Sequence, residues 1–128
     1  MSDEDLKLAK ENIFMKNCGF TLEKDEDGEY YTRAVVTPNI HNQYGMVHGG
    51  LLYTMADTIT GVAARNTGKI GVTLNSSFNY LTNVSEGVII GRAETVRTGN
   101  TVAVFRAVIS DQTGKELAEG TFTYYFLK

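Results

Sequence analysis

A single long helix followed by four strand-length runs is the feature that most constrains the fold of this chain. Apolar residues recur at helical spacing and predict a helix over about residues 49–66. Four runs with the period of a β-strand follow, and short turn signals that suit antiparallel hairpins divide the last three. One helix packed against such strands predicts an α+β fold, in which a curved sheet wraps the helix. The strand runs cover about 72–80, 87–97, 101–111 and 117–127, and the turns are Thr98-Gly99-Asn100 and Gln112-Thr113-Gly114.

The first part of the chain adds another helix and a hairpin. Residues 1–17 contain a predicted amphipathic N-terminal helix, with Ser2 as its cap and Asp5 three residues later. Residues 20–23 and 29–36 are predicted strands around an acidic turn that ends in an Asp-Gly hairpin signal. Nothing resembling a linker divides the 128 residues, so one domain is expected over 1–128. The open edges of its sheet favour pairing with a second copy, and a homodimer is expected.

The charge balance narrows the choice of partners. The chain has 12 basic and 15 acidic residues, a formal net charge of -3, and its Lys and Arg residues are scattered. Binding to nucleic-acid phosphates needs clustered basic residues, so no nucleic-acid partner is expected. No apolar run reaches the roughly 18 residues of a membrane helix, and the N-terminus begins with acidic residues rather than a secretion signal. These features predict a cytoplasmic protein without a membrane partner.

Several common chemistries lack their motif in this sequence. His41 and His48 are separated by an irregular stretch and have no carboxylate at a matching helical spacing, so no metal site is predicted. The absence of a Gly-x-Ser-x-Gly elbow disfavours a serine-histidine-acid triad, and there is no glycine-rich nucleotide loop. Cys18, the only cysteine, lies in the peripheral first part of the chain and is more typical of a small buried residue than of a nucleophile. No cofactor is implied.

The candidate chemistry is concentrated on the long helix. Gly49 and Gly50 leave the first N–H groups of the helix unobstructed, and these donors, together with the helix dipole, stabilise developing negative charge. Asp57 projects roughly 11 Å further along the helix, at 1.5 Å per residue, among small and apolar residues. It is either a catalytic carboxylate or one that faces solvent or caps a neighbouring loop N–H. Gly61, within the same helix, indicates that another element packs close to the backbone there.

One motif joins these residues. The segment Asn42-Gln43-Tyr44-Gly45-Met46-Val47-His48-Gly49-Gly50, followed by Ala56-Asp57, resembles the signature of hotdog-fold acyl-CoA thioesterases. The resemblance is to the PaaI-like, phenylacetic acid degradation group of the 4-hydroxybenzoyl-CoA thioesterase superfamily, and it extends from about Phe20 to the C-terminus. It implies a hotdog fold, hydrolysis of an aryl or medium-chain acyl thioester to the free acid and coenzyme A, and a homotetramer built from catalytic dimers.

The resemblance also implies roles for individual residues. Asn42 would hold or polarise the thioester, and the Gly49 N–H would bind the carbonyl oxygen as it gains charge. Asp57 would activate water as a general base or attack directly as a nucleophile. Thr73 matches a position where a relative uses a serine hydroxyl to help place the water, and an ordinary strand threonine is the alternative. In this family the site lies between subunits, so Asp57 of one subunit would face Asn42 and Gly49 of the other.

Further substrate contacts follow from the same resemblance. His48 would fix the loop at the helix start rather than transfer protons, and both His48 and Gly50 would border the substrate there. The late turn that contains Arg97, Thr98 and Asn100 would meet the phosphates of coenzyme A, and a plain solvated turn is the alternative.

Two other functions fit the same fold. One is an acyl-thioester hydratase, which in this superfamily uses a catalytic histidine in a different loop context. The other is a non-catalytic acyl-CoA sensor, which usually carries a DNA-binding segment. The residues before Cys18 are too few and too acidic for such a segment.

Overall fold

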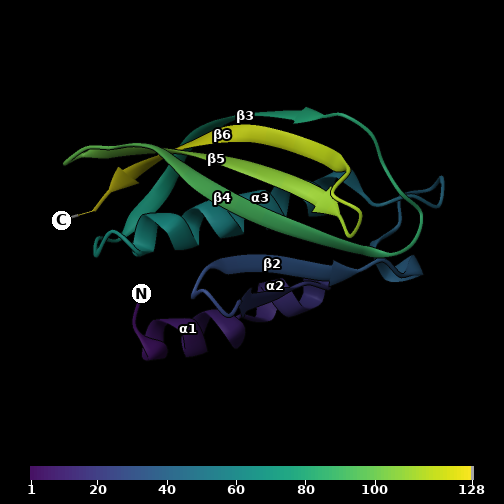
Figure 1. Cartoon of the computed structure of the whole chain (residues 1–128), viewed down its shortest axis with the longest axis horizontal. Helices are drawn as coiled ribbons and strands as arrows, with labels where there is room; N and C mark the ends of the chain where they lie inside the picture. The colour runs from purple at the N-terminus through teal and green to yellow at the C-terminus, as the bar shows by residue number, and fades with distance from the viewer. Residues whose placement is uncertain (128) are drawn as a thin grey trace.

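The computed structural model describes residues 1–127, which form one six-stranded antiparallel sheet, one long helix and two short N-terminal helices. Figure 1 shows the sheet curving over the long helix, with the two short helices on the other side. The α-helices are α1 (Asp3–Lys10), α2 (Ile13–Cys18) and α3 (Gly49–Arg65), and a short 3-10 helix, η1 (Pro38–Ile40), precedes α3. The strands are β1 (Thr21–Lys24), β2 (Tyr30–Val35), β3 (Gly71–Tyr80), β4 (Val88–Thr98), β5 (Val102–Asp111) and β6 (Glu116–Phe126).

The predicted α+β class is confirmed, and the predicted strands and long helix agree with the observed ones to within one residue at each end. Strand order across the sheet is β1-β2-β4-β5-β6-β3. Consecutive strands form the predicted hairpins β4–β5 and β5–β6, but β3 pairs with β6 and therefore lies at an edge of the sheet. Among residues 1–127, no helix is both long and apolar enough to cross a membrane.

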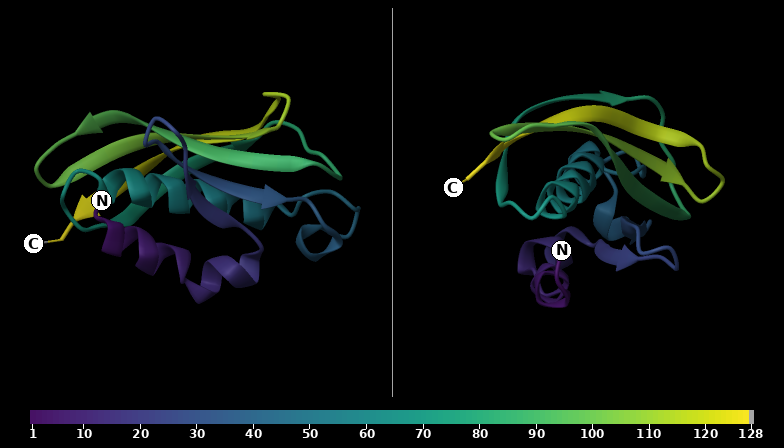
Figure 2. Two further views of the ribbon diagram at one scale, coloured as in Figure 1. Left: turned by 60° about the horizontal axis from the view of Figure 1, so that its bottom comes forward. Right: turned by 60° about the vertical axis from the view of Figure 1, so that its left-hand side comes forward.

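The core lies between α3 and the concave face of the sheet (Figure 2, right). Leu52, Met55 and Ile59, at spacings of three and four on α3, bury one helical face against large side chains such as Phe105 and Phe122. The sheet also approaches the helix at Gly61, where an added Cβ would lie 3.3 Å from the Tyr124 hydroxyl oxygen. The close approach predicted from this glycine is therefore present.

The N-terminal segment differs from the single helix expected from its sequence. α1 ends at Lys10, and Asn12 is extended (φ -63°, ψ 119°) and accepts the Met15 N–H on its side chain at 2.9 Å. That bond caps a second helix, so the chain turns between the two. An ion pair of 3.3 Å between Asp5 and Arg65 joins α1 to the C-terminal end of α3. The two short helices thus lie alongside the long one, as Figure 2 (left) shows.

Strand β3 contains an irregularity that changes which side chains face the helix. Alternation along the sequence places Val72, Leu74, Ser76 and Phe78 on one face and Thr73 on the other. In the structure the register against β6 shifts between Thr73 and Asn75, as at a β-bulge. Thr73 and Ser76 therefore both reach residues of α3, whereas Val72 and Leu74 are exposed. The simple alternation was wrong at the start of this strand.

Candidate active site

His48 caps the N-terminal end of α3. Its Nδ1 accepts a hydrogen bond from the Gly50 N–H at 2.8 Å, and its own main-chain N–H donates to the Ile40 carbonyl at 2.8 Å. The first bond holds the side chain against the first helical turn, and the second ties the turn to the preceding loop. These are the contacts of a residue that fixes the loop, and the suggested contact of His48 with substrate stays a prediction.

The two glycines at the helix start are not equivalent. The Gly50 N–H is already bound to His48, whereas the Gly49 N–H has no hydrogen-bond partner within residues 1–127. An added Cβ at Gly49 would lie 3.2 Å from the Tyr80 ring, and the Tyr80 hydroxyl donates to the Gly49 carbonyl at 3.1 Å. Of the two donors expected from the sequence, one is therefore available to an incoming carbonyl oxygen, at the positive end of the helix dipole.

Asn42 shapes the loop that leads to this helix start. Its Oδ1 accepts the N–H groups of Tyr44 at 2.9 Å and Met46 at 3.2 Å, and its main-chain N–H donates to the Met46 carbonyl at 2.6 Å. The tight turn needs Gly45, whose φ of 77° is in the left-handed region. Within residues 1–127 only Oδ1 of the Asn42 side chain is used in hydrogen bonds, so its Nδ2 amide is available as a donor.

Asp57 is half-buried on α3, and hydroxyl groups of two strands surround it. Thr73 Oγ1 on β3 donates to Asp57 Oδ1 at 2.6 Å. The Tyr124 hydroxyl on β6 lies 3.3 Å from the same Oδ1 and 2.7 Å from the Asp57 main-chain oxygen. Within residues 1–127 no loop N–H reaches the carboxylate, so the capping alternative does not describe this side chain. The Thr73 contact places that residue at Asp57, and its role in the reaction stays a prediction.

Tyr124 is the member of this cluster that the sequence interpretation missed. It is 3% exposed, and burial raises the pKa of its hydroxyl to about 12. A buried, neutral tyrosine at a carboxylate is a hydrogen-bond donor. Gly61 signalled that some group approaches this part of the helix, but nothing in the sequence identified which one.

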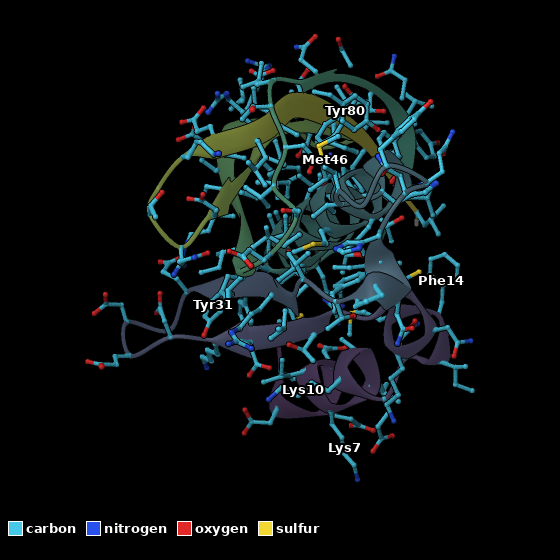
Figure 3. All side chains as sticks on the ribbon, turned by 90° about the vertical axis from the view of Figure 1, so that its right-hand side faces the viewer. Lys7, Lys10, Phe14, Tyr31, Met46 and Tyr80 are labelled. Carbon is cyan, nitrogen blue, oxygen red and sulfur yellow. The ribbon has the colours of Figure 1, made fainter. Side chains whose placement is uncertain are left out.

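Aromatic side chains of α3 and β3 pack together and reach Gly49 at the helix start. Tyr53 and Phe78 pack edge to face with ring centroids 5.4 Å apart, and Phe78 and Tyr80 do the same at 5.1 Å. The Tyr53 hydroxyl is hydrogen-bonded to Ser76 Oγ. Partial desolvation raises the pKa of Tyr80, although much of its side chain is exposed, and its neighbour Tyr53 adds to the shift. Figure 3 looks at this end of the molecule and shows Tyr80 and Met46 above the N-terminal helices.

A groove of about 310 Å³ borders the same helix start. His48 and Gly50 line it and flank Gly49, and Ile40 and Leu51 add apolar surface. The opposite wall comes from the end of α2, through Asn17 and Cys18. The volume of this groove falls within the range of small-molecule binding sites.

The predicted coenzyme A contacts lie elsewhere in the chain. Arg97, Thr98 and Asn100 are exposed at the β4–β5 hairpin, and Lys69 Nζ donates to the Asn100 carbonyl at 2.9 Å. Lys69 follows the C-terminal end of α3, so the hairpin is at the opposite end of the helix from Gly49 (Figure 1). The structure does not bring these residues together with Asn42 and Gly49 within one chain.

Residues 44–118 match the thioesterase superfamily. A hypothetical thioesterase protein from Streptococcus pneumoniae, solved with coenzyme A, is 35% identical, with a TM-score of 0.75 over 84% of this chain and 88% of that one. A 1,4-dihydroxy-2-naphthoyl-CoA hydrolase from Listeria monocytogenes is 26% identical over 80% of this chain and 85% of its own length. A thioesterase from Haemophilus influenzae is 21% identical and has the same fold, with a TM-score of 0.88 over 100% of this chain and 92% of that one.

Two further structures of a thioesterase from Streptococcus pneumoniae contain single substitutions. In one an aspartate is replaced by alanine, and in the other a threonine sixteen positions later is replaced by alanine. Each of these two structures is 34% identical to this chain and covers 84% of it. Because the superfamily match spans more than half of the residues, the chain belongs to the thioesterase superfamily and is a thioester hydrolase with the hotdog fold.

Proposed function

We propose that this protein is an acyl-CoA thioesterase of the PaaI-like group, in which the Asp57 carboxylate drives the attack of water on the thioester. The observation that carries the proposal is the half-buried carboxylate with Oδ1 held by Thr73 at 2.6 Å. The separation of sixteen between Asp57 and Thr73 equals that between the aspartate and threonine substituted in the Streptococcus pneumoniae thioesterase. The coenzyme A bound to that relative and the naphthoyl-CoA substrate of the Listeria monocytogenes hydrolase support the thioester class.

The reaction needs a base and a site for negative charge. In the general-base route, Asp57 takes a proton from water and the water oxygen adds to the thioester carbonyl carbon. The carbonyl oxygen gains charge and accepts hydrogen bonds from the Gly49 N–H and the Asn42 amide; losing one such donor typically costs about 10² to 10³ in rate. The C–S bond then breaks, sulfur leaves with the electron pair and is protonated, and the acid is released. In the nucleophilic route the Asp57 carboxylate attacks the carbonyl carbon first, the C–S bond breaks and coenzyme A leaves as the thiolate. Water then hydrolyses the resulting mixed anhydride, which releases the acid, regenerates the Asp57 carboxylate and supplies a proton for the thiolate.

The catalytic unit of this proposal is a dimer. Asp57 and Gly49 are eight residues apart on one helix, about 12 Å at 1.5 Å per residue, which is too far for one carbonyl group to contact both. Strand β3 is an open edge whose Val72 and Leu74 side chains are 48% and 59% exposed. Pairing of two such edges would cover apolar surface and satisfy free backbone groups. It would also bring Asp57 of one protomer towards Asn42 and Gly49 of the other. The family resemblance further suggests that two such dimers associate into a tetramer.

We place the acyl group in the groove between α3 and α2. His48 and Gly50 line this groove on either side of the Gly49 donor, so a carbonyl bound at Gly49 stands at its mouth. A volume of about 310 Å³ accommodates an aryl or medium-chain acyl group, and the apolar surface of Ile40 and Leu51 suits either. Coenzyme A would extend the other way, towards the Arg97 hairpin of the subunit that supplies Asp57. The cytoplasmic location remains a prediction from the sequence.

The test measures thiol release from phenylacetyl-CoA, benzoyl-CoA and octanoyl-CoA. We expect the native protein to hydrolyse at least one of them, and Asp57→Ala and Asp57→Asn to lower kcat by about 10² to 10⁴, the usual contribution of a positioned base. Thr73→Ala should lower kcat less, and Thr73→Ser, which keeps the hydroxyl, should restore it. Asp27→Asn is the matched control, because Asp27 lies in the exposed β1–β2 turn.

Two outcomes contradict the proposal in different ways. If the Asp57 variants hydrolyse the substrates as fast as the native protein, the assignment of the base is wrong. If the native protein binds acyl-CoA tightly but releases no thiol from any substrate, the sensor alternative is favoured instead.

A further inference from the structure

The buried hydroxyl group of Tyr124 on β6 donates a hydrogen bond to Asp57 from the face of the sheet that packs against α3. The oxygen lies 2.7 Å from the Asp57 main-chain oxygen, 3.3 Å from Asp57 Oδ1 and 2.9 Å from Thr60 Oγ1. Thr60 Oγ1 in turn lies 2.9 Å from the Ala56 carbonyl and 3.1 Å from that of Asp57. Only two hydrogens, those of the Tyr124 and Thr60 hydroxyl groups, are available for the hydrogen bonds among these oxygen atoms.

The short contact determines which way these hydrogens point. If Tyr124 donated to Thr60, its oxygen would face the Asp57 carbonyl oxygen at 2.7 Å with no hydrogen between them, and two lone-pair oxygens repel at that distance. If Tyr124 donates to Asp57, the single Thr60 hydrogen has three acceptors: the Tyr124 oxygen at 2.9 Å and the Ala56 and Asp57 carbonyls at 2.9 and 3.1 Å. Tyr124 thus donates to Asp57, and its oxygen is one of the acceptors for the Thr60 hydrogen; we call this pair of hydroxyl groups the Thr60–Tyr124 relay.

Burial keeps Tyr124 in the form that this relay needs. Its pKa of about 12 leaves the hydroxyl protonated at neutral pH, so it acts as a donor and never as a base in the reaction. Gly61 keeps the adjacent helix surface clear: an added Cβ would stand 3.3 Å from the hydroxyl oxygen. A glycine inside a helix is less favourable than an alanine, and the space needed by Tyr124 explains its presence.

We propose that Tyr124 is a positioning residue for the thioesterase reaction, which together with Thr73 fixes Asp57 Oδ1 and leaves Oδ2 as the oxygen that acts on water or substrate. Within residues 1–127, Thr73 and Tyr124 both reach Oδ1 and no donor reaches Oδ2. The Tyr124 hydrogen has two acceptors on one residue. It is shared between the main-chain oxygen at 2.7 Å and the carboxylate oxygen Oδ1 at 3.3 Å, so one hydroxyl ties the Asp57 carboxylate to its own backbone.

This inference rests on the proposed role of Asp57, and Tyr124→Phe tests it because the ring and its packing against Phe105 are retained. A hydrogen bond to a charged group contributes enough that we expect kcat to fall by about 10- to 100-fold. KM should stay within about twofold, because Tyr124 does not touch the substrate. Thr60→Val, which removes the other end of the relay, should lower kcat less, and Thr60→Ser should restore it. Tyr31→Phe removes a hydroxyl on β2, far from Asp57, and should leave both constants unchanged.

A double-mutant cycle separates a positioning role from a general structural one. If Tyr124 acts through Asp57, adding Tyr124→Phe to Asp57→Asn should cause no further loss of kcat. A native kcat for Tyr124→Phe, or an equal loss in the two backgrounds, overturns the inference while the role of Asp57 stands. A native rate for Asp57→Asn itself overturns both. Circular dichroism and thermal denaturation of Tyr124→Phe identify a variant that fails to fold, in which case the Thr60→Val and Thr60→Ser pair decides.

Discussion

At the scale of single residues, His48 is a helix cap whose ring nitrogen replaces the usual side-chain oxygen. His48→Ala removes the acceptor of the Gly50 N–H, and we expect the free energy of unfolding to fall by about 1 kcal/mol, the usual contribution of a cap. His48→Asn offers a capping oxygen at the same position and should recover most of that loss. Urea denaturation followed by circular dichroism, at a fixed protein concentration, measures both variants. If His48→Ala and His48→Asn lost the same free energy of unfolding, the imidazole ring would stabilise the protein through contacts other than the cap.

The sequence located some residues of the site and not others for a physical reason. Asp57 and Gly49 lie on one helix at a recognisable spacing, so a linear motif identifies them. Thr73 was a candidate only through the family resemblance, because strand alternation alone places it on the wrong face. Tyr124 lies 67 residues from its partner and shares no motif with it. A contact of that kind depends on how β6 is placed against α3, which a local pattern does not encode.

At the scale of elements, periodicity predicted where the strands lie in the sequence but not which of their residues are buried. β5 and β6 have neighbours on both sides, and buried and partly exposed residues alternate along much of their length. β3 has a neighbour on one side only, and most of its residues are exposed even where they are apolar. The bulge near Thr73 depends on pairing with β6, so the sequence of β3 alone does not reveal it. The break in the N-terminal helix is local, and Asn12 was its only signal.

Helix α2 forms one wall of the groove, and its Cys18 can report whether the groove is occupied. Cys18 is the single cysteine and lines the groove, so its alkylation by iodoacetamide reports on occupancy. With the Asp57→Ala variant, which should bind substrate without turnover, octanoyl-CoA is expected to slow alkylation, whereas coenzyme A alone should not. Mass spectrometry of the intact protein measures the rate. Equal protection by the two ligands would place the acyl group outside this groove.

At the scale of the whole molecule, the arrangement of strands decides whether one chain is sufficient for activity. β3 is the edge strand next to the site, and the exposed side chains of Val72, Leu74 and Tyr80 lie along it. In the proposed dimer, pairing through this edge would create two sites, each with Asp57 from one protomer and Asn42 and Gly49 from the other. Sedimentation equilibrium should therefore give at least a dimer. Mass alone does not distinguish a shared site from two independent ones.

Mixing two inactive variants makes that distinction. In a heterodimer of Asp57→Ala and Asn42→Ala chains, one site carries both substitutions and the other carries neither. After joint unfolding and refolding of equal amounts, about half of the dimers should be mixed, and about a quarter of all sites should be native. We therefore expect the thiol-release rate to recover to about a quarter of the native value from two preparations that are each impaired. If each site lay within one chain, no combination of these protomers would contain an intact site, and the mixture would be no more active than its components.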